Sequence, residues 1–431
     1  MATRAPFLKT QYGGYLHRDV PAEDAELTHV GPGTLGGEYL RRFWQPVCFS
    51  DELRDLPYRV RILGEDLVAF RDRRSGVAGL LELHCPHRGT SLEFGLIGDA
   101  GIRCCYHGWL FGIDGEILET PGEPADSTLK DRLFHGAYPI HETNGIVFAY
   151  MGPPELKPPF PHYDTFNRPG YRMIAGQKYC YPCNWLQIME NTMDPVHTAF
   201  LHTIISGAMF TEEFGVLPEL EFVETPIGMI YVGTRRVGDN VWARMVEVVL
   251  PNLHQVAPIW ENGHEEHPFS GPMMSRWCLP LDDTNTMLIE FRHVSETEGV
   301  TPEWWADRNI MLPGQFAADS YEAGQLRPGD YEAQVSQRPI AVHALEHLGA
   351  TDRGVSMVRR QLRHGIRAVK AGADPTGLCR DMGTVIPTYC NNTVVRLPPA
   401  ADQAMDKQLM RETGRRLAEG YLENPPLANG G

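Results

Sequence analysis

Four residues with metal-binding side chains occur in two short, matched motifs. The first motif is Cys85-x-His87 and the second is Cys104-x-x-His107, and the sixteen residues 88–103 separate them. A glycine follows each motif within two positions, which is typical of a tight loop. Two such loops at the tip of a small β domain can hold one metal centre from two sides.

Two kinds of metal centre use two cysteines and two histidines. Zinc binds such a set as a tetrahedron. A [2Fe–2S] cluster of the Rieske type binds the two cysteines through one iron and the two histidines through the other. The spacing favours the cluster, because common zinc folds pair like ligands, usually as Cys-x-x-Cys. Each motif here supplies one cysteine and one histidine instead.

The residues around both motifs resemble the Rieske [2Fe–2S] signature. The first motif continues as Cys-Pro-His-Arg-Gly and the second as Cys-x-Tyr-His-Gly-Trp. The resemblance implies that the thiolates of Cys85 and Cys104 bind one iron and that the imidazoles of His87 and His107 bind the other. Cys105 is adjacent, but only Cys104 has the Cys-x-x-His spacing, so Cys104 is expected to be the ligand.

A second dense run of polar residues follows further along the chain. Glu190, Asp194 and His197 lie at positions i, i+4 and i+7, so they share one face of a helix. Asp194 can then orient the imidazole of His197. His202 is five residues on, about 140° round an ideal helix. If both histidines bind one metal, the helix must end or distort between them, and Pro195 already indicates irregularity.

Two histidines and a carboxylate with open coordination positions are the ligand set of non-haem Fe(II) oxygenases. The alternative interpretation is a helix that carries two histidines in the core. The run Asn191-x2-Asp194-x2-His197-x4-His202 resembles the catalytic motif of the Rieske non-haem iron oxygenases. The resemblance therefore covers both motifs in the right order.

The spacing alone leaves the third iron ligand open. The acidic candidates are Asp319, Glu322, Asp330, Glu332 and Glu346. In the phthalate-dioxygenase-like branch, the ligand precedes a Glu-x-Leu-Gly-x-x-Asp stretch, which this chain has at residues 346–352. The resemblance therefore implies Asp330. The remaining histidines of this region are expected at the surface or in packing roles: His343, His347 and His364.

A proline-rich segment divides the chain. Residues 152–161 contain five prolines, which cannot form a helix or a central strand and are typical of a linker. We expect an N-terminal surface arm over 1–36, a Rieske [2Fe–2S] domain over 37–155, and a catalytic domain with a mononuclear non-haem iron over 156–431.

The fold class predicted is α+β. Short runs with turn residues between them predict a small all-β domain before the linker. After it, mixed patterns predict a catalytic domain with an antiparallel sheet covered by helices. The expected strands include 59–63, 66–70, 145–150, 228–232 and 286–291, and the expected helices are 185–201, 302–323 and 352–370. In the last helix, Asp352 is the expected N-cap and the buried stripe is Val355, Val358, Leu362 and Val369.

Composition excludes several classes of protein. The net charge is −16 and no basic run occurs, which argues against binding nucleic acid through its phosphates. The sequence contains no run of 18 apolar residues, so no membrane-spanning helix is predicted. Nine cysteines over a long chain, with no long apolar segment at the N-terminus, indicate a reducing, cytoplasmic location. The cysteines expected to remain thiols are Cys48, Cys105, Cys180, Cys183, Cys278, Cys379 and Cys390.

The resemblance implies the oxygenase component of a multicomponent system, in the branch of phthalate dioxygenase and the aromatic O-demethylases. Such a protein activates O2 at Fe(II) to hydroxylate or O-demethylate a substituted aromatic acid. The alternatives are a cis-dihydroxylating dioxygenase of the phthalate type, and a zinc- or iron-binding electron-transfer protein without oxygenase activity. The second alternative would leave the residues after the linker unexplained.

The resemblance also implies partners. The chain has no Gly-x-Gly-x-x-Gly fingerprint, so electrons are expected from a separate NAD(P)H-dependent reductase, directly or through a ferredoxin. The family packs subunits head to tail, which implies a homotrimer or a dimer of trimers. In such a ring Asp194 would bridge a cluster imidazole of one subunit, His107, to His197 of the next.

An anionic substrate needs a cationic side chain in its pocket. Arg235, Arg236 and Arg244 lie in strands expected to line it, and Arg244 is the favoured candidate. Residues 203–234 contain no Arg or Lys. A doubly anionic pocket is therefore less supported than one for a monoacid or a methoxylated aromatic.

Overall fold

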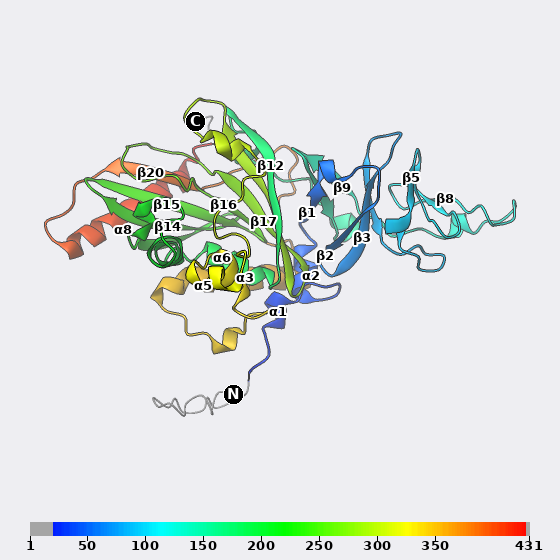
Figure 1. The fold of residues 1–431 in the computed structure, drawn as a ribbon, viewed down its shortest axis with the longest axis horizontal. Helices are drawn as coiled ribbons and strands as arrows, with labels where there is room; N and C mark the ends of the chain where they lie inside the picture. The colour runs from blue at the N-terminus through cyan, green and yellow to red at the C-terminus, as the bar shows by residue number, and fades with distance from the viewer. Residues whose placement is uncertain (1–19, 428–431) are drawn as a thin grey trace.

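A small β domain and a larger sheet domain lie side by side in the computed structural model, which describes residues 20–427 (Figure 1). The small domain is built from three antiparallel sheets with short strands. The first sheet has the order β1 (Trp44–Phe49), β10 (Ile146–Tyr150) and β9 (Ile140–Thr143). The second has the order β2 (Tyr58–Ile62), β3 (Glu65–Arg71) and β4 (Ala78–Glu82). The third has the order β5 (Leu96–Gly98), β6 (Gly101–Arg103), β7 (Leu110–Phe111) and β8 (Ile117–Glu119).

The large domain is one eight-stranded antiparallel sheet with helices on both faces. Its strands in spatial order are β12 (Tyr171–Tyr181), β18 (Asn285–Ser295), β17 (Met274–Asp282), β16 (Leu253–Val256), β15 (Asn240–Val249), β14 (Gly228–Val237) and β13 (Glu219–Thr225), and β20 (Asn391–Arg396) pairs with β15. A separate parallel pair joins β11 (His162–Tyr163) to β19 (Val385–Ile386). The predicted α+β class is confirmed.

Helices cover the sheet because each has an apolar side to bury. The long helices are α3 (Trp185–Thr192), α7 (Arg353–Lys370) and α8 (Gln403–Glu423), and the short ones are α1 (Ala25–Thr28), α2 (Leu35–Leu40), α4 (His197–Ala199), α5 (Tyr321–Leu326) and α6 (Asp330–Val335). Helix α8 packs on the face of β14 that carries Ile230 and Val232. Met229 and Tyr231 point to the opposite face and join the core that contains α3 and α7. No helix in residues 20–427 is long and apolar enough to cross a membrane.

One hydrophobic core continues from the base of the small domain into the large domain. Phe148 of β10 meets Trp277 of β17 with ring centroids 5.2 Å apart. Phe160, in the proline-rich segment, lies between Trp44 and Phe148, with ring centroids 5.8 and 5.0 Å away. The segment expected as a linker is therefore packed against the small domain. The boundaries 37–155 and 156–431 stay predictions.

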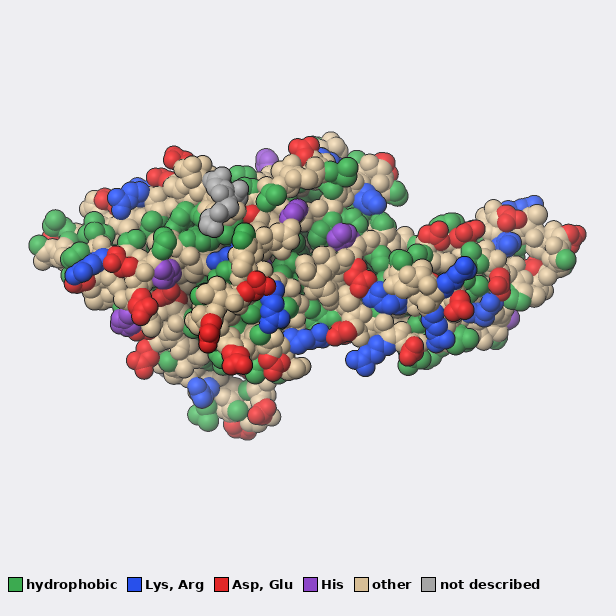
Figure 2. Space-filling view, turned by 90° about the horizontal axis from the view of Figure 1, so that it is seen from above, with side chains coloured by type: hydrophobic (Ala, Val, Ile, Leu, Met, Phe, Trp, Pro, Cys, Tyr) green, Lys and Arg blue, Asp and Glu red, His purple; other side chains and the backbone are tan. Residues whose placement is uncertain are grey.

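The tip of the small domain has a hydrophobic core of its own. Its buried residues come from β3 to β8 and the two metal-binding motifs. They are Val68, Phe70, Leu81, Leu83, Cys85, Leu92, Ile97, Ile102, Cys104, Trp109, Phe111 and Ile117. The tip projects away from the large domain (Figure 1). Side chains of both signs are interspersed over the face seen in Figure 2, without a broad basic patch.

The surface position expected for residues 1–36 is wrong around α1. Residues 1–19 lie outside the described residues. Leu27 and Val30 are fully buried. The Trp185 indole N–H donates to the Leu27 carbonyl over 3.2 Å, and the Asn184 amide donates to the Thr28 carbonyl over 2.8 Å. The residues around α1 are thus part of the large domain's core.

The predicted helix over 352–370 is confirmed as α7, and its four-residue stripe is buried. Asp352 takes the N-cap position, but its carboxylate accepts from the Gly349 amide and not from α7. The helix predicted over 302–323 is wrong. Only the 3-10 turn η9 (Glu303–Ala306) and the start of α5 are helical there. The buried guanidinium of Arg292 instead donates to the Asp307 and Ile310 carbonyls over 2.6 and 2.7 Å, and Pro313 cannot continue a helix.

Replacing Leu27 by alanine tests whether α1 belongs to the core. Leu27→Ala should lower the free energy of unfolding by about 2–5 kcal/mol, because it leaves a cavity among packed side chains. Leu56→Ala is the matched control, since Leu56 is 76% exposed. Urea unfolding of both variants measures the difference. Equal, small effects would show that α1 is only loosely attached.

Two candidate metal centres

The two cluster motifs form loops of the same backbone geometry. In the first loop, the Cys85 amide donates to the Thr90 carbonyl over 2.9 Å, and the Gly89 amide donates back to the Cys85 carbonyl over 2.8 Å. The second loop repeats this pattern, with Cys104 and Trp109 joined over 2.8 Å and Gly108 and Cys104 over 3.1 Å. Both glycines have φ = +74°, a left-handed conformation that suits glycine.

The four predicted cluster ligands meet between these loops. Cys85 and Cys104 are 2% and 3% exposed, whereas Cys105 is exposed. The rings of His87 and His107 have centroids 4.4 Å apart. Burial, together with the neighbouring Cys104 thiol, raises the pKa of Cys85 to about 11. A bound metal would be needed to hold such a group as a thiolate.

The donor set fits a dinuclear cluster. The Nδ1 atom of His87 is buried and makes no hydrogen bond in the described residues, so the site leaves it a lone pair for a metal. Its ring is held in place by stacking on Trp109, with centroids 4.9 Å apart and planes 1° from parallel. Each loop presents one thiol and one imidazole, as two irons with different ligands require.

The second candidate centre depends on a distorted helix. Helix α3 ends at Thr192, ahead of Pro195, so the single helix predicted over 185–201 is wrong. The chain resumes as α4 at His197 and passes directly into the π-helical turn η7 (Phe200–Ile205). A π-helix bonds residue i to residue i+5 and so brings residues five apart to one side. The distortion expected between the two histidines is confirmed, and their ring centroids lie 5.2 Å apart.

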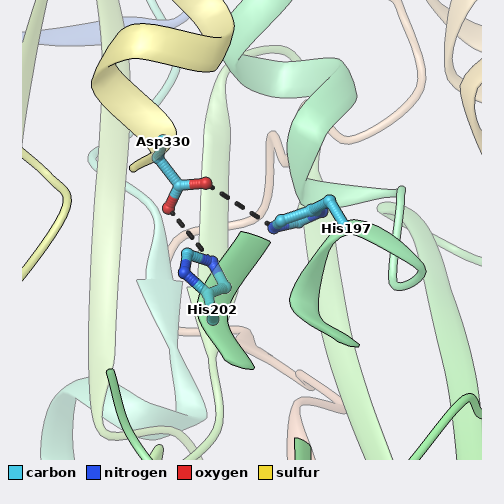
Figure 3. A group of neighbouring side chains, drawn as sticks. All are labelled: His197, His202 and Asp330. Carbon is cyan, nitrogen blue, oxygen red and sulfur yellow. Dashed lines mark ion pairs between the residues drawn. The ribbon is translucent and has the colours of Figure 1, made fainter. Parts of the chain in front are cut away.

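Asp330 completes a group of three possible ligands. It is the first residue of α6, and its Oδ1 and Oδ2 atoms lie 3.7 Å from His197 Nε2 and 3.4 Å from His202 Nε2 (Figure 3). Its Oδ1 atom is buried and accepts no hydrogen bond in the described residues. The group fits a divalent cation, which needs neutral imidazoles and a carboxylate with a free lone pair.

Hydrogen bonds and burial direct both imidazoles toward this group. His197 Nδ1 donates to the backbone carbonyl of Asp194, which leaves Nε2 with a lone pair. The Asp194 Oδ2 atom is 3.7 Å from the same ring nitrogen. Burial opposes protonation of His197, but Asp194 and Asp330 outweigh it and raise its pKa. Burial lowers the pKa of His202 to about 4, so His202 is neutral.

The other acidic candidates lie in different environments. Glu332 accepts from the Gly329 and Ala318 amides over 2.9 and 3.0 Å, which holds the start of α6. Glu346 forms a second possible ligand group with Glu190 and His343. The guanidinium of Arg359 donates to both carboxylates and so already occupies oxygens of that group and offsets one of its two negative charges. Of the five candidates, Asp330 is the one that lies beside both histidines.

A cavity of about 770 Å³ opens beside the three residues, counting the space at its mouth. Half of the residues that line it are apolar or aromatic. These side chains are Ile188, Phe210, Phe214, Tyr181, Tyr231, Val246, Val256, Ile259, Met274, Leu288 and Leu312. Such a concave apolar space next to a metal group has the form of a small-molecule binding site.

Arg244 is the one predicted arginine that lines this cavity. Its two terminal nitrogens donate to the Ala257 and Pro258 carbonyls, each over 2.9 Å, and its buried Nε makes no hydrogen bond in the described residues. Arg235 donates instead to the Val216 carbonyl and the Thr198 hydroxyl. Arg236 is paired with Asp406 of α8.

The polar residues of the cavity wall that the sequence reasoning missed include His254, Arg276 and Gln315. Arg276 forms a buried ion pair with Glu290 over 2.6 Å. The available signal was the charged residues inside two neighbouring apolar strands, Arg276 in β17 and Glu290 and Arg292 in β18. Gln315 lies in an irregular loop, where no periodic pattern indicates which way a side chain points.

The adjacent pair Cys104 and Cys105 offers a direct test of the cluster assignment. Cys104→Ser should abolish the visible absorption of the [2Fe–2S] cluster, because it removes a buried ligand. Cys105→Ser is the matched control and should retain the spectrum, since its side chain points to solvent. Loss of the spectrum in the second variant alone would reverse the assignment.

Comparisons with known proteins agree with this geometry. Residues 43–134 match the model of the Rieske [2Fe-2S] domain, which sets the zinc alternative aside. The chain is 43% identical to the tert-butanol monooxygenase / tert-amyl alcohol desaturase oxygenase subunit of Aquincola tertiaricarbonis, over 95% of this chain and 91% of that protein. It is 38% identical to the phenoxybenzoate dioxygenase subunit alpha of Ectopseudomonas oleovorans, over 88% and 93%. It is 30% identical to the phthalate 4,5-dioxygenase oxygenase subunit of Pseudomonas putida, over 83% and 88%.

Solved structures share the fold. Dicamba monooxygenase bound to dicamba superposes with a TM-score of 0.57 at 19% identity, covering 77% of this chain and 99% of that one. The NdmA protein of Pseudomonas putida CBB5 with caffeine gives 0.59 at 18% identity, covering 81% and 99%. The cofactors are a [2Fe–2S] cluster and a mononuclear iron. The chain belongs to the Rieske non-haem iron oxygenases, as the oxygenase subunit of such a system.

Proposed function

We propose that this oxygenase hydroxylates or O-demethylates a compact, largely apolar molecule that carries one polar group. The observation that carries the proposal is the apolar cavity that opens directly beside the three-residue group of α4, η7 and α6. The proposed cluster ligands are Cys85, His87, Cys104 and His107, and the proposed iron ligands are His197, His202 and Asp330.

The bound cofactors would supply single electrons and the activation of O2, and the chain supplies the environment. Three protein ligands leave coordination positions open on the cavity side. The apolar walls exclude water from the reacting carbon and hold a substrate by shape. Arg244 Nε and the neutral ring of His254, which also lines the cavity, are hydrogen-bonding groups available to a polar substituent.

The charges of the cavity support at most one anionic group on the substrate. Arg276 is already paired with Glu290, and the terminal nitrogens of Arg244 are taken by carbonyls. A second carboxylate would therefore be buried without a partner, which is costly. This supports the aromatic monoacid or methoxylated aromatic expected from the sequence over a phthalate-type diacid. A small tertiary alcohol is the second candidate, because half of the lining residues are apolar or aromatic and a relative with 43% identity is named for tert-butanol.

A substrate panel separates these candidates. The fully loaded enzyme, with NADH and a surrogate reductase, is assayed for O2 uptake and formaldehyde with 4-methoxybenzoate, benzoate, phthalate and tert-butanol. We expect uptake with the methoxybenzoate or the alcohol, and a kcat/KM for phthalate that is lower by about tenfold or more, because of its unpaired carboxylate. Preference for phthalate would contradict the proposed substrate class, and failure of every compound would count against the oxygenation proposed.

We also propose a ring of subunits in which the cluster of one serves the iron site of the next. An open hollow of about 1150 Å³ is lined by Asp194, Asn191, Arg338 and Glu346 among others. Asp194 lies at its wall and contacts His197. A cluster imidazole of a partner subunit docked there would reach the Asp194 carboxylate. The assembly would be a homotrimer or a dimer of trimers fed by a separate reductase.

Asp194→Asn tests this bridge. The variant should keep both metal centres loaded but lose substrate-coupled NADH oxidation, because the amide cannot hold two imidazoles as a carboxylate does. Metal analysis and coupled turnover measure the two properties. Asp374→Asn is the control, since Asp374 forms an exposed pair with Arg380 on another part of the surface. Normal coupled turnover in Asp194→Asn would exclude the bridging role.

A further inference from the structure

Two glycines allow a loop to cross the start of α6 at very short range. A Cβ atom added to Gly329 would lie 2.2 Å from the Cα atom of Gly314, so Gly329 has no room for a side chain. Gly314 has φ = +74°, a left-handed conformation that suits glycine. The Gly314 carbonyl accepts from the Tyr331 amide over 3.0 Å and locks the crossing. The crossing places the next loop residue, Gln315, beside the carboxylate of Asp330.

Gln315 contacts Asp330 in one defined orientation. Its Nε2 donates to Asp330 Oδ2, and its Oε1 accepts from Arg276 Nη1 over 3.1 Å and from the Tyr179 hydroxyl over 3.3 Å. A guanidinium can only donate, so the amide oxygen must face Arg276 and the amide N–H must face Asp330. The side chain is 8% exposed, which leaves it little freedom to turn.

The other end of this chain of contacts is fixed in the sheet. Arg276 of β17 donates twice to Glu290 Oε2 of β18, over 2.8 and 2.6 Å. Glu290 is fully buried, and its second oxygen accepts from Arg292 over 3.1 Å. The order Glu290, Arg276, Gln315, Asp330 therefore connects two central strands to the proposed iron ligand.

The amide of Gln315 is neutral and lies between two charged groups, the Arg276 guanidinium and the Asp330 carboxylate. Arg276 paired directly with Asp330 would neutralise the carboxylate and compete with a metal cation. Gln315 keeps the guanidinium one residue away, yet still holds Oδ2 in place. Oδ1 is left buried, without a hydrogen bond in the described residues, 3.7 Å from His197 Nε2.

We propose that Gln315 is a positioning residue that orients the Asp330 carboxylate and leaves Oδ1 as the oxygen offered to the mononuclear iron. The proposal rests on the iron-ligand role proposed above for Asp330. Groups that hold a metal ligand in this way typically change metal affinity by about 10- to 100-fold when removed.

Metal binding by Gln315→Met tests the proposal without reference to turnover. Methionine is close in volume to glutamine but cannot donate a hydrogen bond. The protein is freed of mononuclear iron with a chelator, its cluster content is checked by visible absorption, and it is titrated anaerobically with Co(II). We expect the Co(II) dissociation constant to rise about tenfold or more. We also expect the visible bands of bound Co(II), which report its coordination, to shift.

Two further variants make the outcome specific. Gln334→Met is the matched control, because Gln334 is also a buried glutamine of the cavity wall but makes no hydrogen bond to Asp330 in the described residues. The Co(II) dissociation constant of Gln334→Met should stay within about twofold of that of the unchanged protein. Asp330→Ala should lose most Co(II) binding. Retained binding in Asp330→Ala would refute the ligand assignment itself, whereas binding by Gln315→Met equal to that of Gln334→Met would refute only the positioning role.

A variant that keeps the amide covers the case in which Gln315→Met does not fold. Gln315→Asn retains the polar group but withdraws it by one methylene from Asp330. Its Co(II) affinity should also fall, with the cluster absorption unchanged. Affinity within about twofold of the unchanged protein in Gln315→Asn would overturn the proposal.

Discussion

The iron site depends on one local distortion, the π-helical turn η7, which begins three residues after His197 and contains His202. On an ideal α-helix these residues would point in directions about 140° apart. The π turn returns the chain to the same side after five residues, so both Nε2 atoms face Asp330. The surrounding structure holds the turn, since His202 is 4% exposed and its carbonyl accepts from the Met209 amide over 2.8 Å. A π-helical turn is less stable than an α-helix, and such turns occur frequently at functional sites.

The large domain buries charged side chains near the cavity, and most of their polar atoms are hydrogen-bonded. Each of three buried arginines is hydrogen-bonded: Arg276 to Glu290, Arg244 to carbonyls, and Arg292 to Glu290 and to loop carbonyls. Asp330 keeps one oxygen without a hydrogen bond. The cavity therefore combines a carboxylate available for a metal with walls whose arginines already have partners. This arrangement suits a compact substrate with little charge.

The cysteine and histidine residues of both metal-binding groups could be predicted, because they follow short, fixed spacings and chemistry limits the residue types. Asp330 was implied only by the family resemblance, because the spacing left five acidic candidates open. The distortion between His197 and His202 could also be predicted, from the angle that separates them. The small β domain and the long helix α7 were predictable from periodicity. The helix expected over 302–323 was not, because Arg292, distant along the chain, satisfies its carbonyls. Gln315 and the buried α1 were missed for the same reason: tertiary contacts determine their positions, and no local pattern marks them.

The central claim is that the π turn brings His202 to the same metal as His197 and Asp330. The most direct measurement is electron paramagnetic resonance of the nitric oxide adduct of the Fe(II)-loaded protein, with the cluster oxidised and therefore silent. The unchanged protein should give the signal of a mononuclear iron–nitrosyl. His202→Ala should lose that signal and keep the cluster signal after reduction. An unaltered nitrosyl signal in His202→Ala would contradict the account.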